Sequence, residues 1–328
     1  MKRKIVDKVL ALLIIAGGIA PFVILLILSN TAPQFDPAAM YRPEGPLLLP
    51  QVDFSILEQL VVCFVSFVLK PLYELIALII VIKLWRSTDR ETAAMRYGLI
   101  AFFTGENACA LNYLLFQENS LVLEYLHLYG MLVGFGFICY SVLITLDARI
   151  LKYSLPEKKC ALLFFCKSCY KSSPVSCTIR RLFQLLLIAA SLIALMPLVS
   201  RLGGYFVIGN VFGTQVVFGH SLIQQIMETR VCPVVAIVFF AIAWLVLQVK
   251  KEKGLELAKI LFAIGLGPLG FSIMRFIVFW GFAHNPIWAD IWEEITEFIL
   301  IAAIYYLLFL SRGSARNEKS IRRESHVA

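Results

Sequence analysis

Long apolar runs alternate with short polar segments along the whole of this 328-residue chain. A helix that crosses a bilayer core about 30 Å thick needs roughly 20 apolar residues. We predict membrane-spanning helices at residues 9–28, 57–85, 97–116, 121–146, 182–200, 231–249, 257–282 and 286–310. The pattern therefore predicts an all-α integral membrane protein of about eight helices, whose two termini lie on the same side of the bilayer.

The basic residues are concentrated in the polar segments between these runs. Of the 30 Lys and Arg residues, 25 lie in residues 1–8, 83–96, 147–181, 250–259 and 311–328. Cytoplasmic loops carry the excess of positive charge, so we predict that these segments and both termini are cytoplasmic, in the inner membrane of a bacterium. Orientation and attraction to anionic lipid explain the net charge of +8, and a nucleic-acid partner is not expected.

The same segments divide the chain into four parts. We predict a four-helix membrane half at 1–146, a basic cysteine-rich cytoplasmic loop at 147–181, a second four-helix half at 182–311 and a basic tail at 312–328. Within the second half, the outer segment 201–230 is apolar but interrupted by glycines. That composition is typical of a short β-hairpin or of a re-entrant segment.

The densest polar pattern lies on the third and fourth predicted spans. Glu106, Asn112 and Tyr113 occupy one arc of the third helix. Glu124 and His127 are three residues apart on the fourth and are therefore neighbours on its surface. Only a short turn separates the two spans, so we predict a helix hairpin that brings these side chains together beneath the outer surface, with Glu106 deepest.

Other ionisable side chains lie within the spans, where a charge is costly unless it is paired or faces a cavity. Lys70 and Glu74 are four residues apart, which predicts a neutralising pair on one helix face. Arg275 lies at a depth similar to that of Glu294 and Glu297, which predicts an arginine–carboxylate pair between the last two spans. Acids outnumber bases there, so one carboxylate is expected to be left over.

Four thiols lie close together in the cytoplasmic loop: Cys160, Cys166, Cys169 and Cys177. Two residues between Cys166 and Cys169 allow both thiolates to reach one metal ion. We predict zinc or an iron–sulfur cluster there, and reduced juxtamembrane thiols, free or acylated, as the alternative. The chain has no Cys-x-x-Cys-His motif, so a c-type haem is not expected.

These patterns favour a membrane subunit of a quinone-linked redox system, working with other subunits of a complex. In that hypothesis Glu106, Glu124 and His127 exchange protons with a quinone near the outer face, and Asn112, Tyr113, Arg275 and Glu297 bind it. A secondary transporter or a proton- or ion-coupled carrier is the first alternative, because unpaired carboxylates and proline-bent helices are typical of such proteins. A scaffold subunit without chemistry is the second alternative, and whether the protein is an enzyme stays open.

Overall fold

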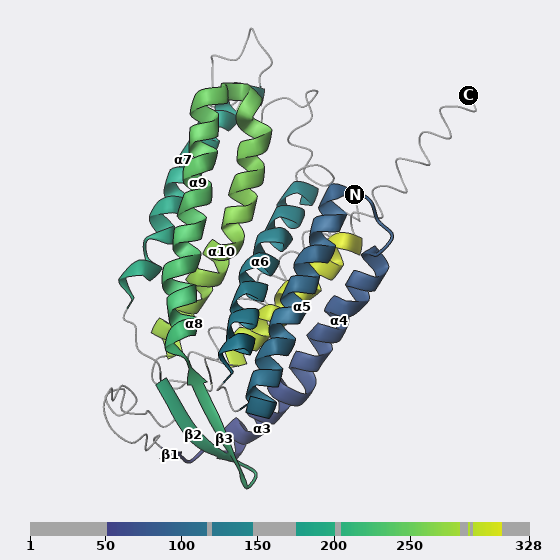
Figure 1. Cartoon of the computed structure of the whole chain (residues 1–328), viewed down its shortest axis with the longest axis vertical. Helices are drawn as coiled ribbons and strands as arrows, with labels where there is room; N and C mark the ends of the chain where they lie inside the picture. Colours follow the sequence, from purple (N-terminus) through teal and green to yellow (C-terminus); the bar gives the residue numbers. More distant parts are fainter. Residues whose placement is uncertain are drawn as a thin grey trace, which may run out of the picture.

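A computed structural model describes residues 51–116, 120–146, 175–200, 205–282, 288 and 291–309. Within these residues, six helices are long and apolar enough to cross a membrane: Ile56–Leu84, Arg90–Phe116, Leu121–Thr145, Leu182–Val199, Leu222–Lys250 and Leu255–Ile277. Residues 291–309 form a further helix, called here the C-terminal helix. The predicted helical membrane protein is thus confirmed (Figure 1). The predicted span 9–28 and the basic tail lie outside the described residues.

The first long helix contains an irregular turn in its middle. It consists of α3 (Ile56–Phe64), the π-helical segment η1 (Val65–Leu69) and α4 (Lys70–Leu84). The π segment directly precedes Lys70 and Pro71, where proline removes a backbone donor from the helix. Such wide turns often mark functional positions, because they rotate the following side chains relative to a regular helix.

A second helix repeats this arrangement. It consists of α8 (Leu222–Ile226), the π-helical segment η4 (Met227–Val231) and α9 (Cys232–Lys250). Pro233 follows its π segment, and Ser221 and Gln224 form a capping box at its start. This helix starts nine residues before the predicted span at 231, because the capping box begins it within the segment predicted to be a loop.

The hairpin of α5 (Arg90–Phe116) and α6 (Leu121–Thr145) is confirmed and is tightly packed. A Cβ atom on Gly130 would lie 2.8 Å from the Cα of Gly105 and 2.8 Å from the carbonyl oxygen of Ala101. Further along the hairpin, a Cβ atom on Gly98 would lie 3.0 Å from the carbonyl oxygen of Gly134, and one on Gly134 would lie 3.1 Å from the carbonyl oxygen of Gly98. Only glycine allows the two backbones to approach this closely.

Two apolar cores lie side by side in the bundle. One joins α4, α5, α6 and the C-terminal helix, with Tyr73, Leu99, Met131 and Ile304 among its buried side chains. The other joins α7 (Val175–Ala194), α9 and α10 (Leu255–Phe282), around residues such as Phe240. Helix α10 links the two groups, because a Cβ atom on its Gly267 would lie 2.4 Å from the carbonyl of Phe135 in α6.

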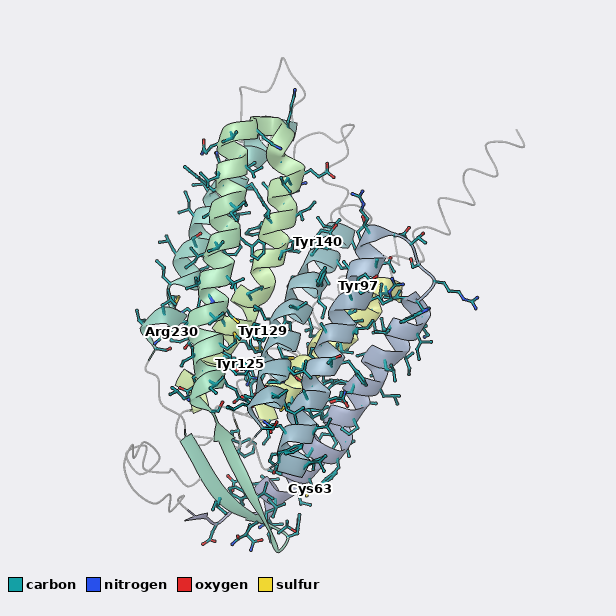
Figure 2. All side chains as sticks on the ribbon, in the orientation of Figure 1. Cys63, Tyr97, Tyr125, Tyr129, Tyr140 and Arg230 are labelled. Carbon is teal, nitrogen blue, oxygen red and sulfur yellow. The ribbon has the colours of Figure 1, made fainter. Side chains whose placement is uncertain are left out.

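A three-stranded sheet closes one end of the bundle and is formed mainly by the outer segment 201–230, for which a β-hairpin was one of the two predicted alternatives. Strands β2 (Tyr205–Val211) and β3 (Thr214–His220) form an antiparallel hairpin, as the glycine pattern predicted, and β1 (Gln51–Val52) pairs in parallel with β2. The hairpin turns at Phe212 and Gly213, both with positive φ. Arg230 in η4 donates to the carbonyl of Pro197 at 2.9 Å, in the 3-10 turn η3 (Pro197–Val199) that follows α7 (Figure 2).

Candidate functional site

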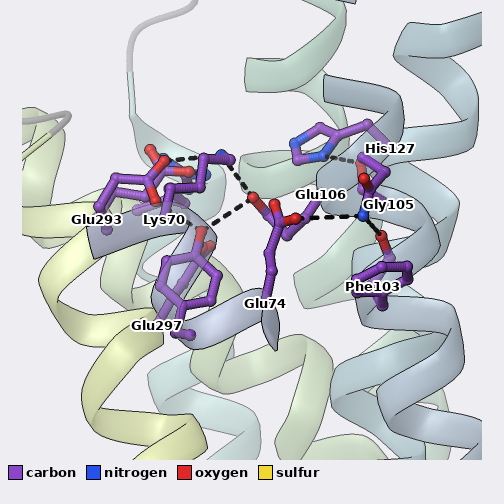
Figure 3. A network of polar contacts seen from close by, with 12 residues as sticks. Lys70, Glu74, Phe103, Gly105, Glu106, His127, Glu293 and Glu297 are labelled. Carbon is purple, nitrogen blue, oxygen red and sulfur yellow. Dashed lines mark hydrogen bonds and ion pairs between the residues drawn. The ribbon is translucent and has the colours of Figure 1, made fainter. Parts of the chain in front are cut away.

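Five polar side chains from three helices meet inside the first core, and we call them the Lys70 cluster: Lys70, Tyr73, Glu106, Glu294 and Glu297 (Figure 3). The Lys70 ammonium lies 2.6 Å from a carboxylate oxygen of Glu106 and 2.8 Å from one of Glu294. Helix α4 supplies the base, α5 one acid and the C-terminal helix the other two. The cluster therefore joins elements that are far apart in the sequence.

The phenol of Tyr73 lies at the centre of the three acids and is fully buried. Its oxygen is 3.2 Å from Glu106, 2.6 Å from Glu294 and 2.8 Å from Glu297. A phenol has one proton and can donate it to only one carboxylate. The remaining short contacts between oxygen atoms are favourable only where a carboxyl group itself carries a proton and donates it.

Charge balance leads to the same conclusion. With every group ionised, three carboxylates and one ammonium give a net charge of −2, and the carboxylate residues Glu106, Glu294 and Glu297 are 1%, 6% and 2% exposed. Uncompensated charge at such depth costs several kcal/mol per ion. One carboxylate oxygen from each of the three acids lies within 4.8 Å of the others, near enough to share protons or to hold a cation. The three buried carboxylates therefore need positive charge beyond that of Lys70 to balance their own charge.

His127 lies next to this cluster and is itself buried. Its Nδ1 is 3.0 Å from the backbone carbonyl of Gly105, a contact that the close packing of α5 and α6 makes possible. A carbonyl oxygen can only accept, so Nδ1 carries the proton and Nε2 of the neutral ring keeps its lone pair. Among the described residues, this carbonyl is the only hydrogen-bond partner of the ring.

The predicted pair of Lys70 and Glu74 is not what the structure shows. Lys70 instead reaches across to two carboxylates on other helices, which give it two charge-assisted contacts where Glu74 offers one. Glu74 accepts a long hydrogen bond from Asn107 at 3.4 Å. Sequence spacing identifies neighbours on one helix but does not reveal stronger partners on another helix.

The predicted outer site divides into two parts. Near the sheet, Glu124 accepts from Asn112 at 3.3 Å and from Ser221 at 3.0 Å, and Asn112 accepts from the backbone N–H of Ser120 at 2.9 Å. Tyr113 is 36% exposed on the outside of α5. Glu106 belongs to the Lys70 cluster, deeper along α5. The roles predicted for Glu124, Asn112 and Tyr113 stay predictions.

A second buried group, which we call the Arg275 cluster, consists of Glu228, Arg275 and Glu293. Both terminal nitrogens of Arg275 bond to the two carboxylate oxygens of Glu293, and its Nε lies 3.2 Å from Glu228. Its guanidinium also lies 5.4 Å from the ring centre of Phe271. The predicted arginine–carboxylate pair exists, but with Glu293 and Glu228 as partners, while Glu294 and Glu297 turn towards Lys70 and Tyr73.

Two members of these clusters were missed from the sequence. Tyr73 was treated as part of an apolar run, although it follows Lys70 by three residues and so lies on the same helix face. Glu228 was assigned to a loop, although the capping box at Ser221 and Gln224 marks an earlier helix start. Of the predicted cysteine site, Cys160, Cys166 and Cys169 lie outside the described residues, and Cys177 has no described side chain.

Comparison of the chain with protein-family models, with curated proteins and with solved structures finds no match. Function is therefore inferred from the chemistry of the buried side chains.

Proposed function

We propose that the protein is a proton-coupled secondary transporter and that the Lys70 cluster is its proton-binding site. One observation carries the proposal: three carboxylates converge on a single phenol and a single ammonium within the helix bundle. Such a group takes up and releases protons because its charge is unbalanced when all of its acids are ionised. In a membrane interior, a carboxylate of this kind is by default a functional group.

The position of the cluster supports coupling of protonation to movement. Lys70, Glu106 and the pair Glu294 and Glu297 sit on three different helices, so each proton that arrives or leaves changes the attraction between them. A difference in proton affinity between two arrangements of these helices is all that coupling requires. The π segment immediately before Lys70 supports the inference that this helix can change its local winding there.

His127 and Glu124 supply a route by which protons can reach the cluster from the end that carries the sheet. Glu124 lies near the start of α6, and His127 follows one turn later beside Glu106. The free lone pair on Nε2 allows His127 to accept a proton while Nδ1 stays bonded to Gly105. In this proposal His127 passes protons, and Glu106, Glu294 and Glu297 store them.

The arrangement of the connections supports the orientation predicted from charge. The basic connections between α4 and α5 and between α9 and α10 lie at the end of the bundle opposite the sheet (Figure 1). We infer that this basic end, and with it both termini, faces the cytoplasm of a bacterial cell, and that the sheet faces outwards.

The proposal is tested with purified protein reconstituted into liposomes that contain a pH-sensitive dye. A pH gradient is imposed, and amino acids, sugars, organic acids and inorganic cations are added one at a time. We expect one class of solute to move protons with the wild-type protein and the response to be lost in Glu297→Gln. Glu58→Gln is the matched control, because Glu58 is a buried acid in the capping box of α3, where glutamine does the same work.

An independent measurement needs no knowledge of the solute. Infrared difference spectra between acidic and alkaline buffer should contain the C=O band of a protonated carboxyl group, and this band should weaken in Glu106→Gln and Glu297→Gln. If the wild-type protein has no such band at any pH at which it stays folded, the Lys70 cluster does not bind protons and the proposal is wrong.

Quinone-linked redox chemistry is the second candidate, and the group of Asn112, Glu124 and Ser221 favours it. An amide and a carboxylate beneath the sheet can bind and protonate a carbonyl oxygen. Quinone in the lipids extracted from the purified protein, lost in Asn112→Leu and retained in Glu297→Gln, would support this function instead. The cysteine loop would then be tested as a metal site by metal analysis of the same preparation.

A further inference from the structure

A small groove lies between α4 and the C-terminal helix, towards the basic end of the bundle. It is lined by Ile80, Lys83, Leu84, Tyr305, Leu308 and Phe309. Ile80 and Leu84 form a buried floor, whereas Tyr305 and Phe309 are 47% and 67% exposed. The walls therefore stand on the outside of the bundle, where the bilayer surrounds it, and the floor is almost wholly apolar.

Lys83 brings a positive charge to the edge of this groove. Its ammonium lies 5.3 Å from the ring centre of Tyr305, and this ring is its only partner among the described residues. A contact with the face of a ring leaves the N–H donors of the ammonium available to another ligand. The groove thus combines an apolar floor with one charged donor group at its rim.

The surroundings of the groove select an anionic ligand. The connection 83–96, which begins at Lys83, carries four basic and two acidic residues. Arg96 is held in place, because it donates to the carbonyl of Trp85 at 2.6 Å and faces the rings of Trp85 and Tyr97. Clusters of Lys and Arg next to a membrane helix attract anionic lipid headgroups.

We propose that this groove binds an anionic phospholipid. One acyl chain lies against Ile80, Leu84, Leu308 and Phe309, and the lipid phosphate accepts hydrogen bonds from Lys83. A lysine at a helix end extends towards the headgroups in this way while its methylene groups stay on apolar surface. The proposal does not depend on proton coupling, although the same two helices carry Lys70, Tyr73, Glu294 and Glu297, so a bound lipid would also hold the Lys70 cluster together.

The test measures thermal unfolding of the purified full-length protein in mild detergent, with phosphatidylglycerol or phosphatidylcholine added. Lys83→Gln is compared with Lys250→Gln, which removes the same charge from an exposed lysine at the end of α9, outside the groove. We expect phosphatidylglycerol to stabilise the wild type and Lys250→Gln more than phosphatidylcholine does. Lys83→Gln should bind phosphatidylglycerol about fivefold more weakly, the effect of one basic residue near the membrane surface.

Further variants and ligands test the apolar wall and the charged rim of the groove separately. Phe309→Ala removes an apolar wall and should weaken both lipids, while Lys83→Arg keeps the charge and should retain the preference for phosphatidylglycerol. Glycerol phosphate, which has the headgroup chemistry without the chains, should stabilise nothing. Equal losses in Lys83→Gln and Lys250→Gln would overturn the proposal, and so would full stabilisation by glycerol phosphate. Native mass spectrometry of each variant counts the bound lipids directly.

Discussion

Glu293 and Glu294 are consecutive residues of the C-terminal helix, yet they belong to different buried clusters. Glu293 bonds to Arg275 of α10, and Glu294 bonds to Lys70 and Tyr73 of α4. The Arg275 cluster has one base and two acids, whereas the Lys70 cluster has one base and three acids around a phenol. The C-terminal helix therefore connects α4 of one group of helices to α10, which links both groups.

The two bases differ in chemistry as well as in number of partners. The guanidinium of Arg275 is planar, always charged and matched to a carboxylate by two parallel bonds, so it fixes geometry. The ammonium of Lys70 is compact, sits on a flexible stem and contacts two of three competing acids. We infer that the Arg275 cluster is a structural joint and that the Lys70 cluster is the part that changes its charge.

Arg275→Met should have the largest effect on stability. It leaves the buried Glu228 and the partly buried Glu293 without Arg275, a change that costs about 3–5 kcal/mol in the free energy of unfolding. Unfolding in mild detergent measures the loss, and Arg275→Lys should recover only part of it because lysine cannot form the two parallel bonds. A variant as stable as the wild type would mean that this cluster is not a joint.

Lys70→Met should give a loss that depends on pH. The three acids of the cluster then lack a cation, so they must be protonated to stay buried, and the folded state binds more protons than the unfolded state. Stability therefore falls as pH rises. We expect a loss of about 2–3 kcal/mol in alkaline buffer and under about 1 kcal/mol in acid. A loss that is the same at both pH values would contradict the proposed protonation of these acids.

Glu293→Gln and Glu294→Gln form a matched pair that tests the comparison directly. Glu293→Gln breaks the paired bonds to Arg275 and should cost about 1.5–3 kcal/mol. Glu294→Gln removes one of three mutually repelling acids and should change stability by less than about 1 kcal/mol, while it weakens proton coupling. Equal effects of the two substitutions on stability would show that the clusters do not differ in the way proposed.

The helices of the molecule could be predicted from the sequence better than the contacts between buried side chains could. Long apolar runs require membrane-spanning helices whatever surrounds them, and the short turn after Phe116 can only join an antiparallel pair. The close approach of α5 and α6 at Gly130 and Gly134 also has a local cause, since the absence of a side chain is visible in sequence. These features depend on local properties of the chain.

The partners of the buried charges could not be predicted in the same way. Glu294 is only one residue further from Arg275 in sequence than Glu293 is, and the choice between them depends on the rotation of the C-terminal helix. One residue of sequence corresponds to about 100° around a helix, so neighbouring acids face different groups. The π segments before Lys70 and Cys232 shift the faces of two further helices, and sequence spacing does not reveal them.

His127→Gln should have the smallest effect on stability and a specific effect on proton movement. The side-chain amide of glutamine can still donate to the carbonyl of Gly105, so we expect a change of less than about 1 kcal/mol in the free energy of unfolding. Glutamine has no group that accepts and releases a proton at neutral pH, so the cluster should exchange protons more slowly with the outside. The rate at which its carboxyl infrared band responds to a pH jump measures this. If that rate is unchanged, protons reach Glu106 by another route, and the Lys70 cluster remains the storage site without His127 as its entrance.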